Sequence, residues 1–156
     1  MSYDFRVVEI DDEEPASCAC GRRRERVYID LGDPTYNIGG ILRRATGVVF
    51  AQSKRMPLTD ALAMWEGACR TMEAAESNED ELAQYRALEP GNGWGDFESA
   101  VRVAHRTRIA LAEIVDAGGV RVPEWEALRS EEYDSDEERD AKPMRFVRAD
   151  RLVFVA

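Results

Sequence analysis

The sequence predicts an α+β fold, in which a small, mainly antiparallel sheet is covered on one face by three to four helices. The sheet is expected to draw on both termini and on residues near Val120. Two observations lead to this fold class. Apolar residues alternate with polar ones at the two ends of the chain, whereas helical spacing of apolar residues occupies the middle.

The first two strands are predicted to form an antiparallel hairpin. Residues 3–10 and residues 26–31 both show the alternation that is typical of half-buried strands, with Phe5 and Val7 on one face of the first. An acidic stretch that ends at Pro15 lies between them and favours a turn. A helix in either segment would contradict this prediction.

A short helix is predicted next, with Thr35 or Asn37 as its N-cap and Gly47 as its end. Gly39 and Gly40 lie early in this helix, where each glycine costs about 1 kcal/mol relative to alanine. We therefore expect another backbone segment or a ligand to come close to this turn.

Two further helices follow a connector at residues 48–56. The first is predicted to begin at Thr59 and to bury a stripe of four side chains: Leu62, Trp65, Cys69 and Met72. The second is expected to begin at a capping box formed by Asn78 and Glu81. Its inward side chains are predicted to be Leu82, Tyr85 and Leu88.

The longest helical pattern follows a glycine-rich turn that carries Trp94. Asp96 is predicted to cap this helix, and the glycines at 118 and 119 are predicted to end it. Glu98 and Arg102 are spaced for an i, i+4 ion pair. The helix has a wide apolar face, made of Phe97, Ala100, Val101, Val103, Ala104, Leu111, Ile114 and Val115. Such a face indicates a broad packing partner, which we expect to be the sheet.

Length and charge predict the domain organisation. The 156 residues suit one α+β domain at residues 1–122, a flexible acidic segment at 123–142 and a C-terminal strand at 143–156 that returns to the sheet. The net charge is −10, and residues 123–142, with nine acids and three bases, contribute −6 of it. Because acidic surfaces repel nucleic acids, we expect no direct nucleic-acid partner.

The sequence predicts a cytoplasmic protein. It has three cysteines, an odd number that does not suit a disulfide framework, and we see no secretion signal at its start. No apolar run approaches the roughly 20 residues that a membrane-spanning helix needs, so we expect no membrane partner.

Two short motifs carry a family resemblance. Thr35-Tyr36-Asn37 before a short helix, and Asn92-Gly93-Trp94-Gly95-Asp96 before a long one, resemble a family of small uncharacterised proteins of actinobacteria and their phages. The resemblance covers about residues 27–122. It implies a layout of strand, short helix, longer helices, glycine-rich turn, long helix and terminal strand, but it implies no activity.

Neither a metal nor a cofactor is expected. Cys18, Cys20, Cys69 and His105 have the composition of a zinc site. However, Cys18 and Cys20 are separated by one residue rather than the usual two to four, and Cys69 lies in a predicted core stripe. Ordinary thiols are therefore the favoured interpretation.

No catalytic residues are expected, so a binding role is favoured over an enzyme. His105 is the single histidine, and any histidine-based acid–base chemistry would need it. Asp96 is half a turn out of phase with it, and Glu98 is about 10 Å away along the helix. A partner for His105 would have to come from another element.

The two helix starts are the candidate ligand sites, because free N–H groups there attract anions and glycine allows close approach. Trp94 could stack on a flat ligand. The favoured alternative is structural: Trp94 plugs the edge of the core and Asp96 only caps the helix, whereas a ligand site would leave Trp94 exposed. The candidate residues are Thr35, Tyr36, Asn37, Asn92, Trp94 and Asp96.

Three functional hypotheses follow. The leading one is a non-enzymatic binding or accessory protein, encoded by a phage as the resemblance implies, that contacts a host protein. The second is capture of a small nucleotide-like ligand at the helix starts. The third is an acidic decoy that mimics DNA through residues 123–142.

Overall fold

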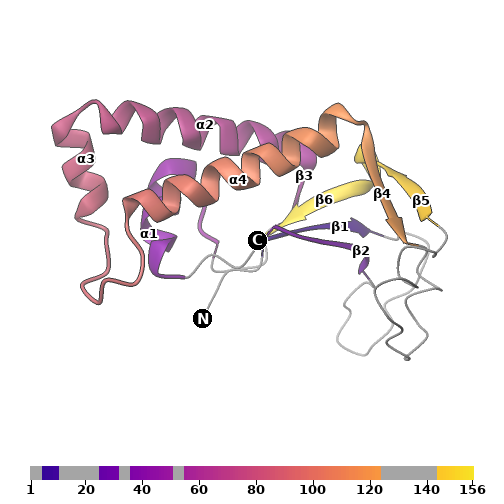
Figure 1. The fold of residues 1–156 in the computed structure, drawn as a ribbon, viewed down its shortest axis with the longest axis horizontal. Coiled ribbons are helices and arrows are strands. Elements are labelled where there is room, and N and C mark those ends of the chain that lie inside the picture. The colour runs from indigo at the N-terminus through magenta and orange to yellow at the C-terminus, as the bar shows by residue number, and fades with distance from the viewer. Residues whose placement is uncertain (1–4, 11–24, 32–35, 51–54, 124–143) are drawn as a thin grey trace.

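The computed structural model describes residues 5–10, 25–31, 36–50, 55–123 and 144–156. These residues form an α+β fold, as predicted, in which helices pack beside small antiparallel sheets (Figure 1). The strands are β1 Arg6–Ile10, β2 Glu25–Asp30, β3 Arg55–Pro57, β4 Gly119–Pro123, β5 Met144–Arg148 and β6 Leu152–Val155. The helices are α1 Gly39–Thr46, α2 Leu58–Glu76, α3 Glu79–Arg86 and α4 Phe97–Asp116, with 3-10 turns η1 Tyr36–Ile38 and η2 Ala149–Arg151.

Both termini contribute to a four-stranded antiparallel sheet of order β2-β1-β6-β3. The predicted hairpin is confirmed, because β1 pairs antiparallel with β2 and places Val7 opposite Ile29. On its other side β1 pairs with β6, where Val7 lies opposite Phe154. The short strand β3 was predicted to be part of a connector. It pairs with β6 instead, and its three residues are too few to show a periodicity.

The strand near Val120 was predicted to join the main sheet, and this was wrong. Strand β4 pairs with β5 in a separate two-stranded sheet, in which Val120 lies opposite Val147. The C-terminal segment therefore contains two strands, and η2 carries the chain from one sheet to the other. Arg145 of β5 forms an ion pair with Glu9 of β1, which is almost fully buried, so the two sheets are joined by charge as well as by chain.

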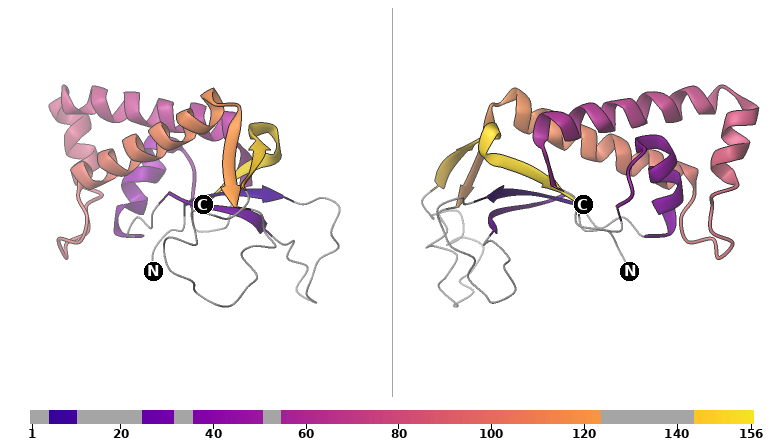
Figure 2. Two further views of the ribbon diagram at one scale, coloured as in Figure 1. Left: turned by 45° about the vertical axis from the view of Figure 1, so that its right-hand side comes forward. Right: turned by 180° about the vertical axis from the view of Figure 1, so that it is seen from behind.

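The two long helices, α2 and α4, lie side by side above the strands, and α1 and α3 pack at the end remote from β4 and β5 (Figures 1 and 2). Helix α4 was predicted to pack on a sheet, but its principal partner is α2. The small side chains of Ala100 and Ala104 are fully buried on α4. Alanines on the buried face of a helix let a neighbouring backbone come close, so they suit a helix as the partner.

Four aromatic side chains from distant parts of the chain form the centre of the core. Phe5 lies with its ring centroid 5.2 Å from Phe50, 5.4 Å from Trp65 and 5.6 Å from Phe154. The rings of Phe50 and Trp65 are stacked at 5.8 Å. This cluster connects the segment before β1, the segment after α1, helix α2 and strand β6.

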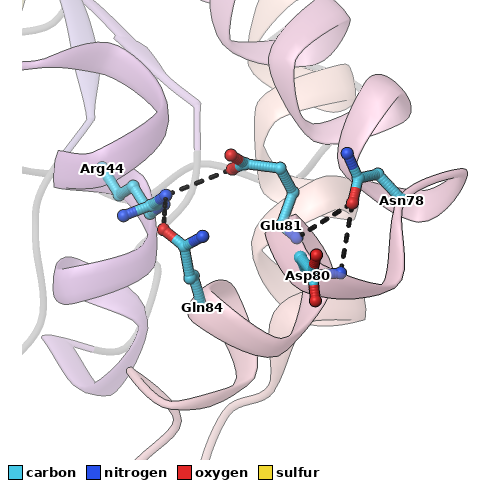
Figure 3. Close-up of polar contacts among 5 residues, drawn as sticks. All are labelled: Arg44, Asn78, Asp80, Glu81 and Gln84. Carbon is cyan, nitrogen blue, oxygen red and sulfur yellow. Dashed lines mark hydrogen bonds and ion pairs between the residues drawn. The ribbon is translucent and has the colours of Figure 1, made fainter.

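The predicted capping box of α3 forms only in part: Asn78 caps the helix, but the Glu81 carboxylate accepts from Arg44 and the N–H of Asn78 donates to Ala75 O. Asn78 accepts hydrogen bonds from the backbone N–H groups of Asp80 and Glu81, at 3.1 and 3.3 Å (Figure 3). Figure 3 also shows Arg44 of α1 reaching α3, where it donates to Glu81 at 3.2 Å and to Gln84. Arg44 and the glutamate and glutamine on α3 therefore hold α1 against α3.

The inward face of α3 differs in part from the prediction. Tyr85 is buried and Leu82 is half-buried, but Leu88 is 40% exposed because it follows the helix rather than belonging to it.

The start of α1 also differs from the prediction. The N-cap is Ile38, without a side-chain hydrogen bond, because η1 leads directly into the helix. Thr35 lies outside the described residues, and Asn37 lies within η1. The end at Gly47 is confirmed by its left-handed φ of 72°. The approach expected at the two glycines of α1 is not close at Gly40: a Cβ there would lie 3.7 Å from Leu88 Cβ and 3.8 Å from Leu88 O, which are ordinary van der Waals contacts that do not require glycine.

Candidate functional site

The connection between α3 and α4 presents the most exposed large apolar side chain in the described part of the chain. We call residues 90–95 the Trp94 turn. The N–H of Gly93 donates to Pro90 O at 3.2 Å, and the side chain of Asn92 accepts from the N–H of Trp94 at 3.0 Å. Gly93 and Gly95 have φ angles of 70° and 118°, which other residues rarely adopt. Short-range hydrogen bonds and glycines thus set the path of this turn.

Two carboxylates occupy the start of α4. Asp96 accepts from the backbone N–H of Ser99 at 2.7 Å, so the predicted cap is confirmed. Glu89, which precedes the turn, accepts from the backbone N–H of Phe97 at 3.0 Å. The sequence analysis missed Glu89, because no local motif signals a cap from seven residues before Asp96. With both carboxylates in place, the helix start is a poor site for an anionic ligand.

Trp94 was predicted to be buried as a plug at the edge of the core, and this was wrong. Its side chain is 71% exposed. The aromatic ring that is buried at this helix start is Phe97, as its place on the apolar face predicted, and its ring centroid lies 5.1 Å from that of Tyr85.

Replacing Trp94 by alanine is therefore expected to leave the free energy of unfolding unchanged to within about 0.5 kcal/mol. The matched control is Phe97→Ala, three residues away, which should cost about 3–5 kcal/mol because it empties a buried aromatic site. Urea unfolding followed by far-UV circular dichroism measures both. A Trp94→Ala variant destabilised as much as Phe97→Ala would mean that the Trp94 ring is buried in solution.

The carboxylate of Asp96 makes an acid-dependent contribution to stability. Hydrogen bonding by Ser99, through its side chain and then its backbone N–H, lowers the pKa of Asp96. The pKa is lower in the folded protein than in the unfolded chain, where it is about 3.9. The stabilisation is thus present above the unfolded value and is lost as the pH falls through the folded value.

Asp96→Asn is the matching variant, because asparagine is an equally good N-cap but does not titrate. We expect melting temperatures close to wild type at pH 7, and a smaller loss of stability than wild type between about pH 4 and pH 2. Thermal melts at these pH values measure the difference. Parallel losses in the two proteins would contradict the role of the ionised carboxylate.

The ion pair expected between Glu98 and Arg102 does not form. Glu98 pairs with Arg86 of α3 at 2.7 Å, and Arg102 donates to the hydroxyl of Ser99 at 2.8 Å. The ion pair between Arg86 and Glu98 joins the end of α3 to the start of α4. These two charged side chains beside the Trp94 turn are therefore paired with each other.

The structure brings the two predicted helix starts into one region. Both η1 and α1 contact α4. Asn37 is half-buried in η1, and the backbone of Tyr36 belongs to the same turn. The side chain of Tyr36 and the whole of Thr35 lie outside the described residues. Of the four candidates whose side chains are described, Asn92, Trp94 and Asp96 are exposed and Asn37 is half-buried.

Of the residues considered for metal binding and catalysis, only Cys69 and His105 are described, and they lie within α2 and α4 rather than on the turn. Cys18 and Cys20 fall outside the described residues. Cys69 is buried in α2, and burial raises the pKa of its thiol. His105 has a partner from another element, because its Nε2 lies 3.4 Å from the carboxylate of Glu73 on α2. Within the described ranges, no group of three histidine, cysteine or acidic side chains could hold a metal ion.

No protein-family model matches the sequence, and comparisons with curated proteins and with solved structures give no significant match. None of the helices in the described part of the chain is long and apolar enough to span a membrane.

Proposed function

We propose that the protein is a non-enzymatic accessory protein that binds another protein through the Trp94 turn. The observation that supports this proposal is the 71% exposure of the Trp94 side chain on a turn whose path is set by hydrogen bonds and glycines. Tryptophan is enriched among the residues that dominate protein interfaces, because it buries a large area and has few rotatable bonds.

The surroundings of Trp94 support this proposal. Asn92 and Asp96, two residues before and two after Trp94, are polar and exposed, and Leu88 adds a second exposed apolar side chain on the same connection. An apolar centre with a polar rim is the usual composition of a protein-binding patch. Because the turn is held in place before binding, little conformational entropy is lost when a partner covers it.

A protein partner is favoured over a nucleotide. At the start of α4, the backbone N–H of Phe97 donates to Glu89 and that of Ser99 donates to Asp96. A phosphate group would have to displace or lie beside these carboxylates, which is electrostatically unfavourable. The resemblance to phage proteins favours a host protein as the partner. The third hypothesis is an acidic decoy for DNA-binding proteins and concerns residues 123–142. All of these residues except Pro123 lie outside the described part of the chain.

A pull-down from host lysate with the tagged full-length protein tests the proposal. The matched control is Ile109→Ala, because Ile109 is also an exposed apolar residue, 47% accessible, but lies far along α4 from the turn. We expect a partner that wild type and Ile109→Ala retain and that Trp94→Ala loses. Equal recovery with all three proteins would refute a role for the turn.

A thermal-shift screen against nucleotides distinguishes the second hypothesis. If the turn binds a protein, any nucleotide should shift the melting temperatures of wild type and Trp94→Ala equally or not at all. A shift that depends on Trp94 would favour ligand capture at the turn instead.

A further inference from the structure

Among the described residues, strand β5 has one edge that pairs with no other strand. It pairs only with β4 in its two-stranded sheet, and it lies at the end of the molecule opposite the Trp94 turn (Figure 1). Within the described residues, no backbone hydrogen bond joins the outer side of β5 to another segment. An unpaired strand edge is a template for a further strand.

The register identifies which backbone groups of β5 point outward. The N–H of Ala149 donates to Gly118 O at 2.9 Å, immediately beyond the ladder in which Gly119 lies opposite Arg148. In an antiparallel pair, hydrogen-bonded and non-hydrogen-bonded positions alternate. The backbone groups of residues 145, 147 and 149 therefore bond to β4, the strand that precedes residue 124. The backbone N–H and C=O groups of Met144, Phe146 and Arg148 point away from β4.

The same three residues also share the outer face of the sheet. Phe146 is 53% exposed and Met144 is 49% exposed, whereas Val147 on the opposite face is buried. Arg148 is paired with Asp150 at 3.0 Å. The open edge thus combines free hydrogen-bonding groups with apolar side chains, and its exposed arginine is already neutralised.

We infer that β5 pairs with β5 of a second copy of this chain, antiparallel and about a twofold axis at Phe146. In this register Phe146 lies opposite its own copy, and Met144 lies opposite Arg148 of the other strand. Outward backbone groups then meet outward backbone groups at each of these positions, and the two small sheets become one of four strands. A twofold axis makes the contact self-complementary and closed.

The other strand edges are less suited to this pairing. Strand β3 has three residues and ends in Pro57, which has no N–H to donate. Strand β2 has the sequence ERVYID, in which three of six residues are of charged types, a composition that opposes pairing at a strand edge.

The dimer is weak. Half of the surface of two large side chains in each copy amounts to about 400 Å² of apolar area. Even with the backbone of one strand edge added, the buried area stays below the roughly 1,200–2,000 Å² of total surface in a standard interface, so we expect the dimer only at high protein concentration. Each copy carries a charge of −10, and salt screens the repulsion between them, so the dimer is more stable at higher ionic strength.

Sedimentation velocity of the full chain from about 10 µM to 1 mM tests the inference, with Phe146→Lys and Phe146→Glu as the central variants. Each places like charges directly opposite each other and is expected to be monomeric, whereas an equimolar mixture places lysine opposite glutamate and is expected to dimerise. Ile109→Glu and Trp94→Ala change exposed side chains elsewhere and should dimerise like wild type.

The inference is overturned if wild type is monomeric at 1 mM, or if the mixture stays monomeric while both variants show wild-type circular dichroism and melting. It is also overturned if Ile109→Glu or Trp94→Ala abolishes the dimer. Because Trp94→Ala is expected to keep the dimer and lose the protein partner, this inference and the proposed function can fail separately.

Discussion

Replacing Gly119 by alanine is expected to destabilise the protein by more than about 3 kcal/mol. Gly119 is buried at the start of β4 with a φ of 152°, a region that L-residues rarely adopt. A Cβ at this position would collide with the carbonyl oxygen of Val147 and lie 2.9 Å from Arg148 Cα. Both neighbours belong to the backbone of β5, so the β4–β5 ladder would have to open.

The matched control is Gly67→Ala. Gly67 lies within α2, and a Cβ there would meet nothing within 4 Å. Because glycine is less favourable than alanine in a helix, we expect this variant to be more stable than wild type by about 0.5–1 kcal/mol. Urea denaturation measures both free energies. A Gly119→Ala protein as stable as Gly67→Ala would mean that β4 does not follow this path in solution.

Replacing Trp65 by alanine is expected to cost about 3–5 kcal/mol. The Trp65 side chain is fully buried and contacts the rings of Phe5, Phe50 and Phe154. Together with Trp65, these rings come from four segments that are distant in the sequence. Removing the indole therefore weakens the contact between α2 and the main sheet. Guanidinium unfolding followed by circular dichroism avoids relying on the fluorescence of the deleted residue.

Trp65→Phe separates the loss of volume from the loss of the polar group. The indole Nε1 is buried, and no hydrogen-bond acceptor for it is found among the described residues. Phenylalanine keeps a ring in the cluster and removes this unsatisfied donor, so we expect a cost of only about 1 kcal/mol. A loss as large as that of Trp65→Ala would instead indicate that the N–H has a partner in solution.

Signals within a few residues of each other predicted the local structure well. Asn78 and Asp96 act as N-caps as expected, because each side chain accepts from backbone N–H groups at most three residues away. The end at Gly47 also forms as expected, because it depends on the left-handed backbone of that glycine itself. The pairing of β1 with β2 was also predictable, since alternation in both strands requires a shared apolar face.

The sequence alone determined which residues share a face, and the tertiary structure decided what covers each face. Periodicity described the apolar stripe of α4 but not that α2 would cover it, and it described β4 but not its partner. Phe97 and Trp94 flank the same helix start with similar apolar surface, yet one is buried and the other exposed. Phe97 lies on the apolar face of α4, whereas Trp94 lies on the turn before the helix, where no periodicity indicates whether a side chain is buried.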